Sequence, residues 1–106
     1  MRVGRRIEIR GVVQGVGFRP WVYRLAREEG VAGRVRNDTT GVTIEAFGSE
    51  DALDLFIRRI ESAPPPAAYI EELRASPILV EPIDAFVIAQ SVNAVERRVS
   101  IPPDLA

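Results

Sequence analysis

Apolar and polar residues alternate along several short segments of the chain, which is the pattern of half-buried β-strands. Within residues 6–11, Ile7 and Ile9 share one side of the predicted strand, and charged residues share the other. A short second strand is predicted over residues 31–37, and a turn follows over residues 38–41. The third strand is marked by the alternating apolar residues Val42, Ile44 and Ala46.

Two other segments carry apolar residues at the spacing of an amphipathic α-helix. The first begins at Pro20, which suits a first helical turn, and stops at Gly30. Its apolar face consists of Val22, Leu25 and Ala26. The second follows Ser49, a favourable N-cap residue, and is ended by the prolines of residues 64–66. Its apolar face consists of Leu53, Phe56, Ile57 and Ile60.

Two further strands are predicted, over residues 69–76 and residues 85–90. The resulting order is β-α-β-β-α-β-β, and two helices that each connect strands pack most simply on one face of a single sheet. We therefore expect an α+β fold over residues 1–90, a ferredoxin-like α/β sandwich with an extra edge strand. Residues 91–106 lack a regular pattern and are expected to form a C-terminal linker.

The composition excludes several kinds of chemistry. The 106 residues suit one domain and include no Cys, His or Lys. Catalysis by Ser-His-Asp or Cys-His groups, Schiff-base chemistry and nearly all zinc sites are thereby removed, and any metal would need oxygen ligands. We expect no metal and no cofactor. No apolar run reaches the ~18 residues of a membrane helix, and the N-terminus does not have the pattern of a secretory signal. The absence of cysteine fits a cytoplasmic protein.

Positive charge is concentrated in the first third of the chain. Residues 1–36 carry nine Arg and three Glu, whereas residues 37–106 carry five Arg and twelve acidic residues. This distribution is what an anion site in the N-terminal part would require, but a solvated surface with uneven charge is the better explanation for most of these arginines. We expect neither nucleic acid nor a membrane as a partner.

The most informative segment is the glycine-rich stretch between the first strand and the first helix. Glycines let backbone N–H groups approach an anion closely, and the positive end of the following helix points at the same place. An arginine at the start of that helix offers a planar fork of donors for phosphate oxygens. The candidate phosphate-binding residues are Gln14, Gly15, Val16, Gly17, Phe18 and Arg19.

Two familiar phosphate motifs do not fit this segment. A Walker loop ends in Gly-Lys-Ser/Thr, and the chain contains no Lys. The dinucleotide fingerprint requires a glycine three residues after Gly17, where Pro20 stands. By spacing alone, the glycines could equally form a tight turn with Arg19 on the surface.

The full string is more specific, because it resembles the loop of the acylphosphatase family, Gly-x-Val-Gln-Gly-Val-Gly-Phe-Arg, over residues 11–19. Asn37 and Gly41 also match this family, and the resemblance covers about residues 5–90. It implies hydrolysis of acyl phosphates, with Arg19 and Asn37 as the catalytic residues: Arg19 holds the phosphoryl group and Asn37 orients the attacking water. Without the resemblance, Asn37 would be interpreted as ordinary turn chemistry.

A narrower resemblance points to one branch of this family. Residues 19–26 and 100–106 are similar to the N-terminal acylphosphatase-like domain of HypF-type carbamoyltransferases, which help to mature nickel–iron hydrogenases, and to the segment that leaves that domain. The resemblance implies carbamoyl phosphate as the small-molecule substrate. It also implies that residues 91–106 lead toward zinc-binding and carbamoyltransferase regions of the same polypeptide, which this sequence lacks.

Two alternatives to an enzyme are compatible with this fold. The first is a non-catalytic module of the same fold that binds carbamoyl phosphate or docks a neighbouring domain. The second is a small RNA-binding domain, since that class shares the β-α-β-β-α-β plan. The third strand, residues 42–46, has none of the aromatic residues on which RNA bases stack, and the chain is acidic overall, so RNA binding is the weakest interpretation.

Overall fold

The computed structural model describes residues 1–13, 15, 17–39 and 41–89. The expected linker, residues 91–106, and the candidate site residues Gln14 and Val16 lie outside the described residues. In chain order the elements are β1 (Arg2–Val12), α1 (Phe18–Glu29), β2 (Ala32–Asn37), β3 (Gly41–Ser49), α2 (Glu50–Ser62), β4 (Tyr69–Ile78) and β5 (Phe86–Ile88). Neither helix of the described chain is long and apolar enough to cross a lipid bilayer.

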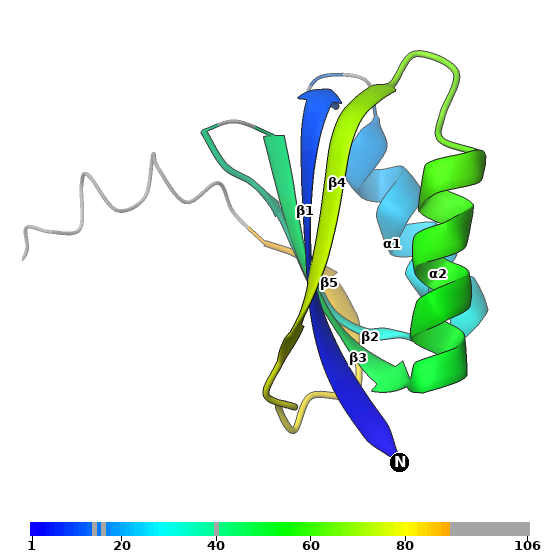
Figure 1. Ribbon diagram of the computed structural model, residues 1–106, viewed down its shortest axis with the longest axis vertical. Coiled ribbons are helices and arrows are strands. Elements are labelled where there is room, and N and C mark those ends of the chain that lie inside the picture. The colour runs from blue at the N-terminus through cyan, green and yellow to red at the C-terminus, as the bar shows by residue number, and fades with distance from the viewer. Residues whose placement is uncertain (14, 16, 40, 90–106) are drawn as a thin grey trace, which may run out of the picture.

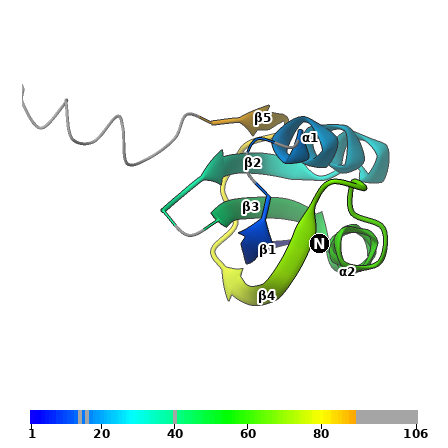
Figure 2. The same cartoon turned by 90° about the horizontal axis from the view of Figure 1, so that it is seen from above.

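The five strands form one mixed sheet in the order β4-β1-β3-β2-β5 (Figure 1). Strand β1 runs antiparallel to β3 and β4, β2 runs antiparallel to β3, and β5 pairs with β2 in parallel. Both helices lie on the same face of this sheet, α1 over β2 and β5 and α2 over β3 and β1 (Figure 2). The predicted ferredoxin-like sandwich with an extra edge strand is confirmed.

Some element boundaries differ from the predictions because pairing with distant segments sets them. Strand β1 begins at Arg2 rather than at residue 6, since its first residues pair with the end of β3. Strand β4 continues through Pro77 to Ile78. Proline is tolerated there because β4 is an edge strand of the described sheet, so one row of its hydrogen-bonding groups has no neighbouring strand.

The two helices begin differently. The Ser49 hydroxyl accepts a hydrogen bond from the Ala52 backbone N–H at 3.1 Å, and Glu50 and Asp51 complement the positive end of α2. Helix α1 begins at Phe18, two residues before Pro20, and has neither a side-chain cap nor an acidic residue in its first turn. The N-terminus of α2 is therefore satisfied within the chain, whereas that of α1 is open to an external anion.

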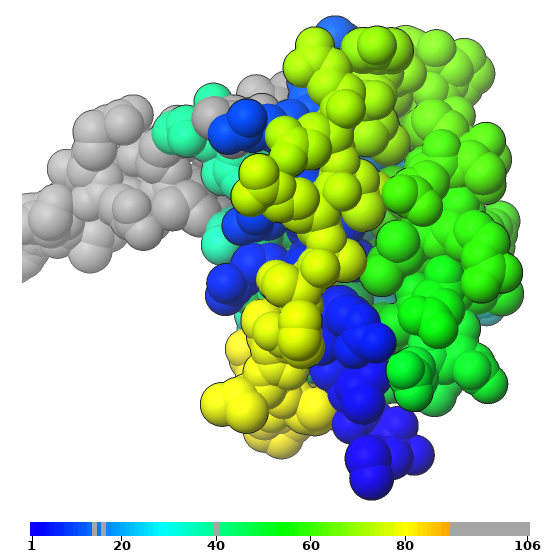
Figure 3. All heavy atoms as spheres, in the orientation of Figure 1, coloured from blue at the N-terminus to red at the C-terminus, as the bar shows by residue number. Residues whose placement is uncertain are grey.

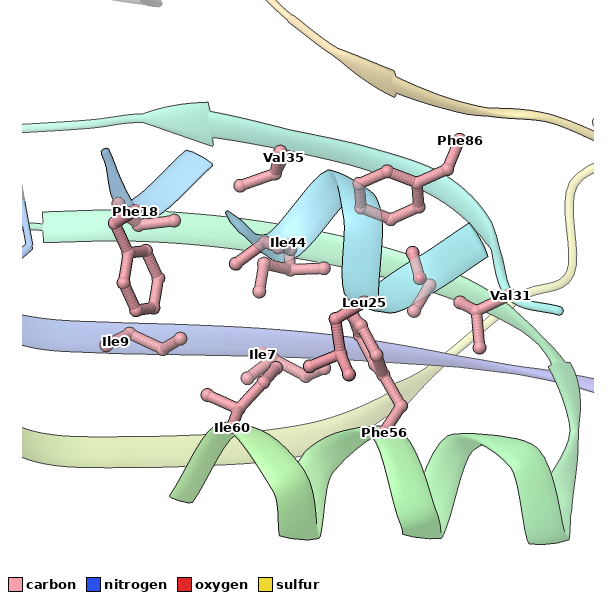
Figure 4. Close-up of a cluster of buried hydrophobic side chains, with 14 of the residues drawn as sticks. Ile7, Ile9, Phe18, Leu25, Val31, Val35, Ile44, Phe56, Ile60 and Phe86 are labelled. Atoms are coloured by element: carbon pink, nitrogen blue, oxygen red, sulfur yellow. The ribbon is translucent and has the colours of Figure 1, made fainter. Parts of the chain in front are cut away.

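A single apolar core fills the space between the sheet and the helices (Figure 4). Phe56 and Ile60 of α2 point toward Leu25 of α1 and Ile7 of β1, and all four side chains are buried. The ring of Phe86 in β5 packs edge-on against Phe56, with 6.3 Å between ring centroids. Burying one large side chain contributes roughly 1.5–3 kcal/mol, so Phe86 fixes the short edge strand to the core.

The other face of the sheet carries an ion-pair cluster centred on Glu45 of β3. Arg6 and Arg34 are its direct cross-strand partners, and both donate hydrogen bonds to its carboxylate. Arg36 Nη1 lies 3.7 Å from the same carboxylate. Burial raises the pKa of the Glu45 carboxyl, but the arginine hydrogen bonds outweigh burial, so this pKa lies below its ordinary value.

Strand β4 forms one edge of the sheet and lies at the surface of the molecule. Figure 3 shows β4 and α2 side by side on the surface, with the start of β1 emerging below them. The β1–α1 loop lies at the far end of the molecule from that start (Figure 1). The described candidate residues of this loop therefore lie at one end of the sandwich.

Candidate active site

The sheet brings the ends of β1 and β2 to the same edge. Both strands are antiparallel to β3, so they point in the same direction. Ile9 of β1 and Asn37 of β2 pair with the same residue, Val42, from opposite sides. Two strand spacings separate them, which is about 10 Å. The loop after β1 and the side chain of Asn37 are thus neighbours across the top of β3.

The described glycines of the loop have the backbone conformation that an anion-binding turn requires. Gly15 and Gly17 both have φ of 75°, in the left-handed region that other residues rarely adopt. Apart from its chain neighbours, no heavy atom of the described residues lies within 4 Å of the position that a Cβ would take at either glycine, so backbone conformation rather than crowding favours glycine. Successive N–H groups in such turns form concave anion sites.

Helix α1 continues directly from this loop. Gly17 is its N-cap, and its carbonyl accepts the first helical hydrogen bond, from the Trp21 N–H at 3.2 Å. The N–H groups of the first turn have no side-chain cap, and the partial positive charge of the helix end adds to them. Phe18 is buried, so only its backbone N–H can contact a ligand.

Arg19 lies in the first turn of α1 and is partly exposed. In the described part of the chain, no carboxylate and no carbonyl binds its guanidinium. This contrasts with Arg6, Arg34 and Arg36, which surround Glu45. Arg19 therefore keeps its donors for an external acceptor, next to the loop amides.

Asn37 is the last residue of β2 and lies two residues after the buried Val35. Residues two apart in a strand share a face, so Asn37 belongs to the face of the sheet that α1 covers. Its Oδ1 atom is buried and has no hydrogen-bond partner among the described residues. Leaving such an acceptor unsatisfied costs about 1–3 kcal/mol. A water or ligand donor at this position would remove that cost.

The structure thus places Gly15, Gly17, Phe18, Arg19 and Asn37 at one end of the sandwich. Two features could not be inferred from the sequence pattern: the buried acceptor on Asn37, and the hydrogen bonds by which Asp38 holds the β2–β3 turn. Asp38 follows Asn37 directly in a turn-forming segment, which was the available signal.

A hollow of about 800 Å³ lies at the opposite end, beside the end of α1. The two arginines that line it are already engaged: Arg27 donates to the Tyr23 hydroxyl at 3.2 Å, and Arg2 donates to the Ile83 carbonyl at 2.7 Å. Asp84 adds a negative charge to its wall. The start of α1 therefore suits an anion better than this hollow does.

The fold is a ferredoxin-like α/β sandwich, and its glycine loop, helix start and Arg19 have the chemistry of a phosphate site. Comparison with known proteins identifies the family to which this phosphate-site chemistry belongs. The acylphosphatase family model matches residues 5–88. The chain belongs to the acylphosphatase family.

The most similar relatives include both large and small members. The chain is 60% identical over 68 residues to carbamoyltransferase HypF2 of Cupriavidus necator, covering 64% of this chain and 8% of that protein. A crystal structure of full-length HypF in the phosphate- and nucleotide-bound form superimposes with a TM-score of 0.83 and 30% identity, covering 96% of this chain and 16% of that one. Acylphosphatase from Bacillus subtilis superimposes with a TM-score of 0.76 and 32% identity, covering 84% of this chain and 99% of that one.

These relatives differ greatly in length. The match spans less than one fifth of the carbamoyltransferases and nearly all of the Bacillus acylphosphatase. The shared unit is therefore the acylphosphatase sandwich itself. Most residues of the carbamoyltransferases lie outside this matched unit.

Proposed function

We propose that the chain hydrolyses acyl phosphates, and that its substrate is carbamoyl phosphate. The proposal includes its role: the acylphosphatase domain of a HypF-type carbamoyltransferase in hydrogenase maturation, working with downstream domains of the same polypeptide. The observation that supports this chemistry best is the Arg19 guanidinium, which is unengaged within the described chain. It lies beside two left-handed glycines and a helix N-terminus that no described side chain caps.

In the proposed reaction, the phosphoryl group lies among the loop amides. The backbone N–H groups of Gly15, Gly17, Phe18 and Arg19 donate to its oxygens, and the Arg19 fork binds two of them. These donors stabilise the charge that spreads over the equatorial oxygens in the transition state. Positioning and charge stabilisation are most of what phosphoryl transfer requires, which suits a chain without histidine.

Asn37 is proposed to orient the attacking water. Its Oδ1 accepts a hydrogen bond from the water, whose oxygen then attacks phosphorus in line with the leaving group. The new water–phosphorus bond forms as the bond from phosphorus to the carbamate oxygen breaks. Carbamoyl phosphate and water thereby give carbamate and inorganic phosphate, and the protons of the water pass to phosphate and solvent. Carbamate is a good leaving group, so little general-acid help is needed.

The test is phosphate release from carbamoyl phosphate and acetyl phosphate by the purified chain. Arg19→Ala should lower turnover on the order of 10³-fold or more, because it removes the cation that stabilises the transition state. Arg24→Ala is the matched control, since Arg24 is an exposed residue of the same helix with no described partner. It should leave turnover unchanged.

Two outcomes would contradict the proposal. Unchanged turnover in Arg19→Ala would remove the mechanism. Saturable binding of carbamoyl phosphate by the wild-type chain without any phosphate release would support the alternative, a non-catalytic binding module of the same fold.

A further inference from the structure

We propose that Asp38 is a positioning residue, which fixes the direction of the Asn37 side chain from the opposite face of the sheet. The inference rests on the proposed function, because its kinetic consequence depends on the water that Asn37 is proposed to hold. Its structural part concerns the β2–β3 turn alone and is measurable without substrate.

Asp38 closes the turn through both its backbone and its side chain. Its backbone N–H donates to the Gly41 carbonyl at 2.9 Å, and the Gly41 N–H donates to Asp38 Oδ1 at 2.9 Å. The Thr43 hydroxyl donates to Asp38 Oδ2. Each carboxylate oxygen is therefore held by a donor from β3, so the backbone at residues 37 and 38 is fixed relative to that strand.

Thr43 makes this contact rigid. It is 5% exposed and is the one buried polar residue in the described part of the chain. A buried hydroxyl without a partner is costly, so the Thr43–Asp38 bond is strongly favoured. Thr43 lies on the face of β3 opposite to the core residues Val42 and Ile44.

The side chains of Asn37 and Asp38 thus lie on opposite faces of the sheet. Asp38 accepts a hydrogen bond from Thr43 on the open face of the sheet, which is the face opposite to the two helices. Asn37 shares the helix-covered face with Val35. Because the Asp38 bonds fix the backbone at residues 37 and 38, the side chain of Asn37 has little conformational freedom. The Oδ1 atom of Asn37 is buried and has no hydrogen-bond partner among the described residues, so it is available to accept from a water at the site.

The turn is also held against β1, whose end leads into the glycine loop. A Cβ on Gly41 would stand 1.9 Å from the Ile9 carbonyl oxygen, so the two strands meet in a contact that glycine alone permits. The Asp38 bond to the Gly41 N–H therefore ties Asn37 to the strand that presents the loop. Relative placement of the water and the phosphoryl group depends on this link.

Misplacing a reacting group by about 1 Å can reduce turnover roughly 100-fold while leaving ground-state contacts intact. Loss of the Asp38 link should thus lower kcat by about 10- to 100-fold. Inorganic phosphate affinity should change less than about threefold, because the loop amides and Arg19 are untouched.

The experiment uses two pairs of variants and a control. Asp38→Ala removes the side-chain bonds to Gly41 and Thr43, whereas Asp38→Asn can still accept from Gly41 and can donate to Thr43. Thr43→Val removes the hydroxyl at constant shape, and Thr43→Ser restores it. Ser49→Ala is the control: it deletes a comparable hydrogen bond at the opposite end of the molecule, where α2 begins.

We expect kcat to fall in Asp38→Ala and Thr43→Val, to recover in Asp38→Asn and Thr43→Ser, and to stay at the wild-type value in Ser49→Ala. Loss of phosphate affinity in parallel with kcat, or unchanged kcat in both deletion variants, would overturn the positioning role. If Asp38→Ala does not fold, the Thr43 pair decides.

A second readout separates this inference from the proposed function. The side-chain amide signal of Asn37 in NMR spectra should shift and broaden in Thr43→Val and remain sharp in Ser49→Ala. If the wild-type chain releases no phosphate, the proposed function fails, yet this signal still tests the positioning role. An Asn37 signal that is identical in all variants would refute it.

Discussion

At the scale of single residues, the site depends on conformation as much as on residue type. The sequence predicted a set of residues for anion binding, and its resemblance to a known loop implied the roles that we propose for Arg19 and Asn37. It could not predict the left-handed backbone at Gly15 and Gly17, or the face to which Asn37 belongs. The hydrogen bond between Asp38 and Thr43 was equally hidden, because it requires the β2–β3 register.

Replacing Gly17 by alanine should weaken phosphate binding through the backbone alone. Gly17→Ala and Gly30→Ala both place a Cβ at φ above 70° where no atom obstructs it, so each should cost about 1–2 kcal/mol of unfolding free energy. Only the Gly17 variant distorts the anion turn, since Gly30 caps the other end of α1. Chemical denaturation and calorimetric phosphate titration measure both quantities. Equal phosphate affinities in the two variants would contradict the role of the turn.

At the scale of helices and strands, periodicity was sufficient for the order of the elements but not for their limits or their surface contacts. The amphipathic pattern of residues 53–60 correctly indicated a helix, because its cap and its apolar face are local features. The first residues of β1 and the passage of β4 through Pro77 depend on partners far away in the chain. The ion-pair cluster around Glu45 has the same origin, since three strands contribute to it.

The Glu45 cluster should make stability depend on pH in a defined direction. The Glu45 pKa lies below its ordinary value of 4.5, so its contribution is complete above that pH and is lost as pH falls through the lower, folded-state pKa. Glu45→Gln leaves Arg6, Arg34 and Arg36 without their shared acceptor. It should reduce the unfolding free energy at pH 7 by about 1–3 kcal/mol.

Denaturant unfolding of the wild type and the variant between pH 7 and pH 3 measures this effect. The difference between them should shrink below about pH 4.5 as the wild-type carboxylate is protonated. Glu71→Gln, at an exposed position of β4, is the control and should show no such difference. A Glu45 difference that persists at pH 3 would show that packing, not charge, is responsible.

At the scale of the whole molecule, the sandwich has two ends with different chemistry. The N-terminal excess of arginine pointed to an anion site, yet much of that charge lies in ion pairs on the open face of the sheet. What distinguishes the loop end is that, within the described chain, Arg19 has no partner and no side chain caps the start of α1. The hollow at the other end of the sandwich, beside Arg27, was not predictable from the sequence, because segments distant in sequence line it.

The most direct test is an NMR titration of the wild-type chain with inorganic phosphate, which follows every backbone amide. We expect saturable shifts at Gly15, Gly17, Phe18 and Arg19, and we expect these shifts to disappear in Arg19→Ala. Saturable shifts confined to the hollow beside Arg27, or no saturable shifts at all, would contradict this expectation.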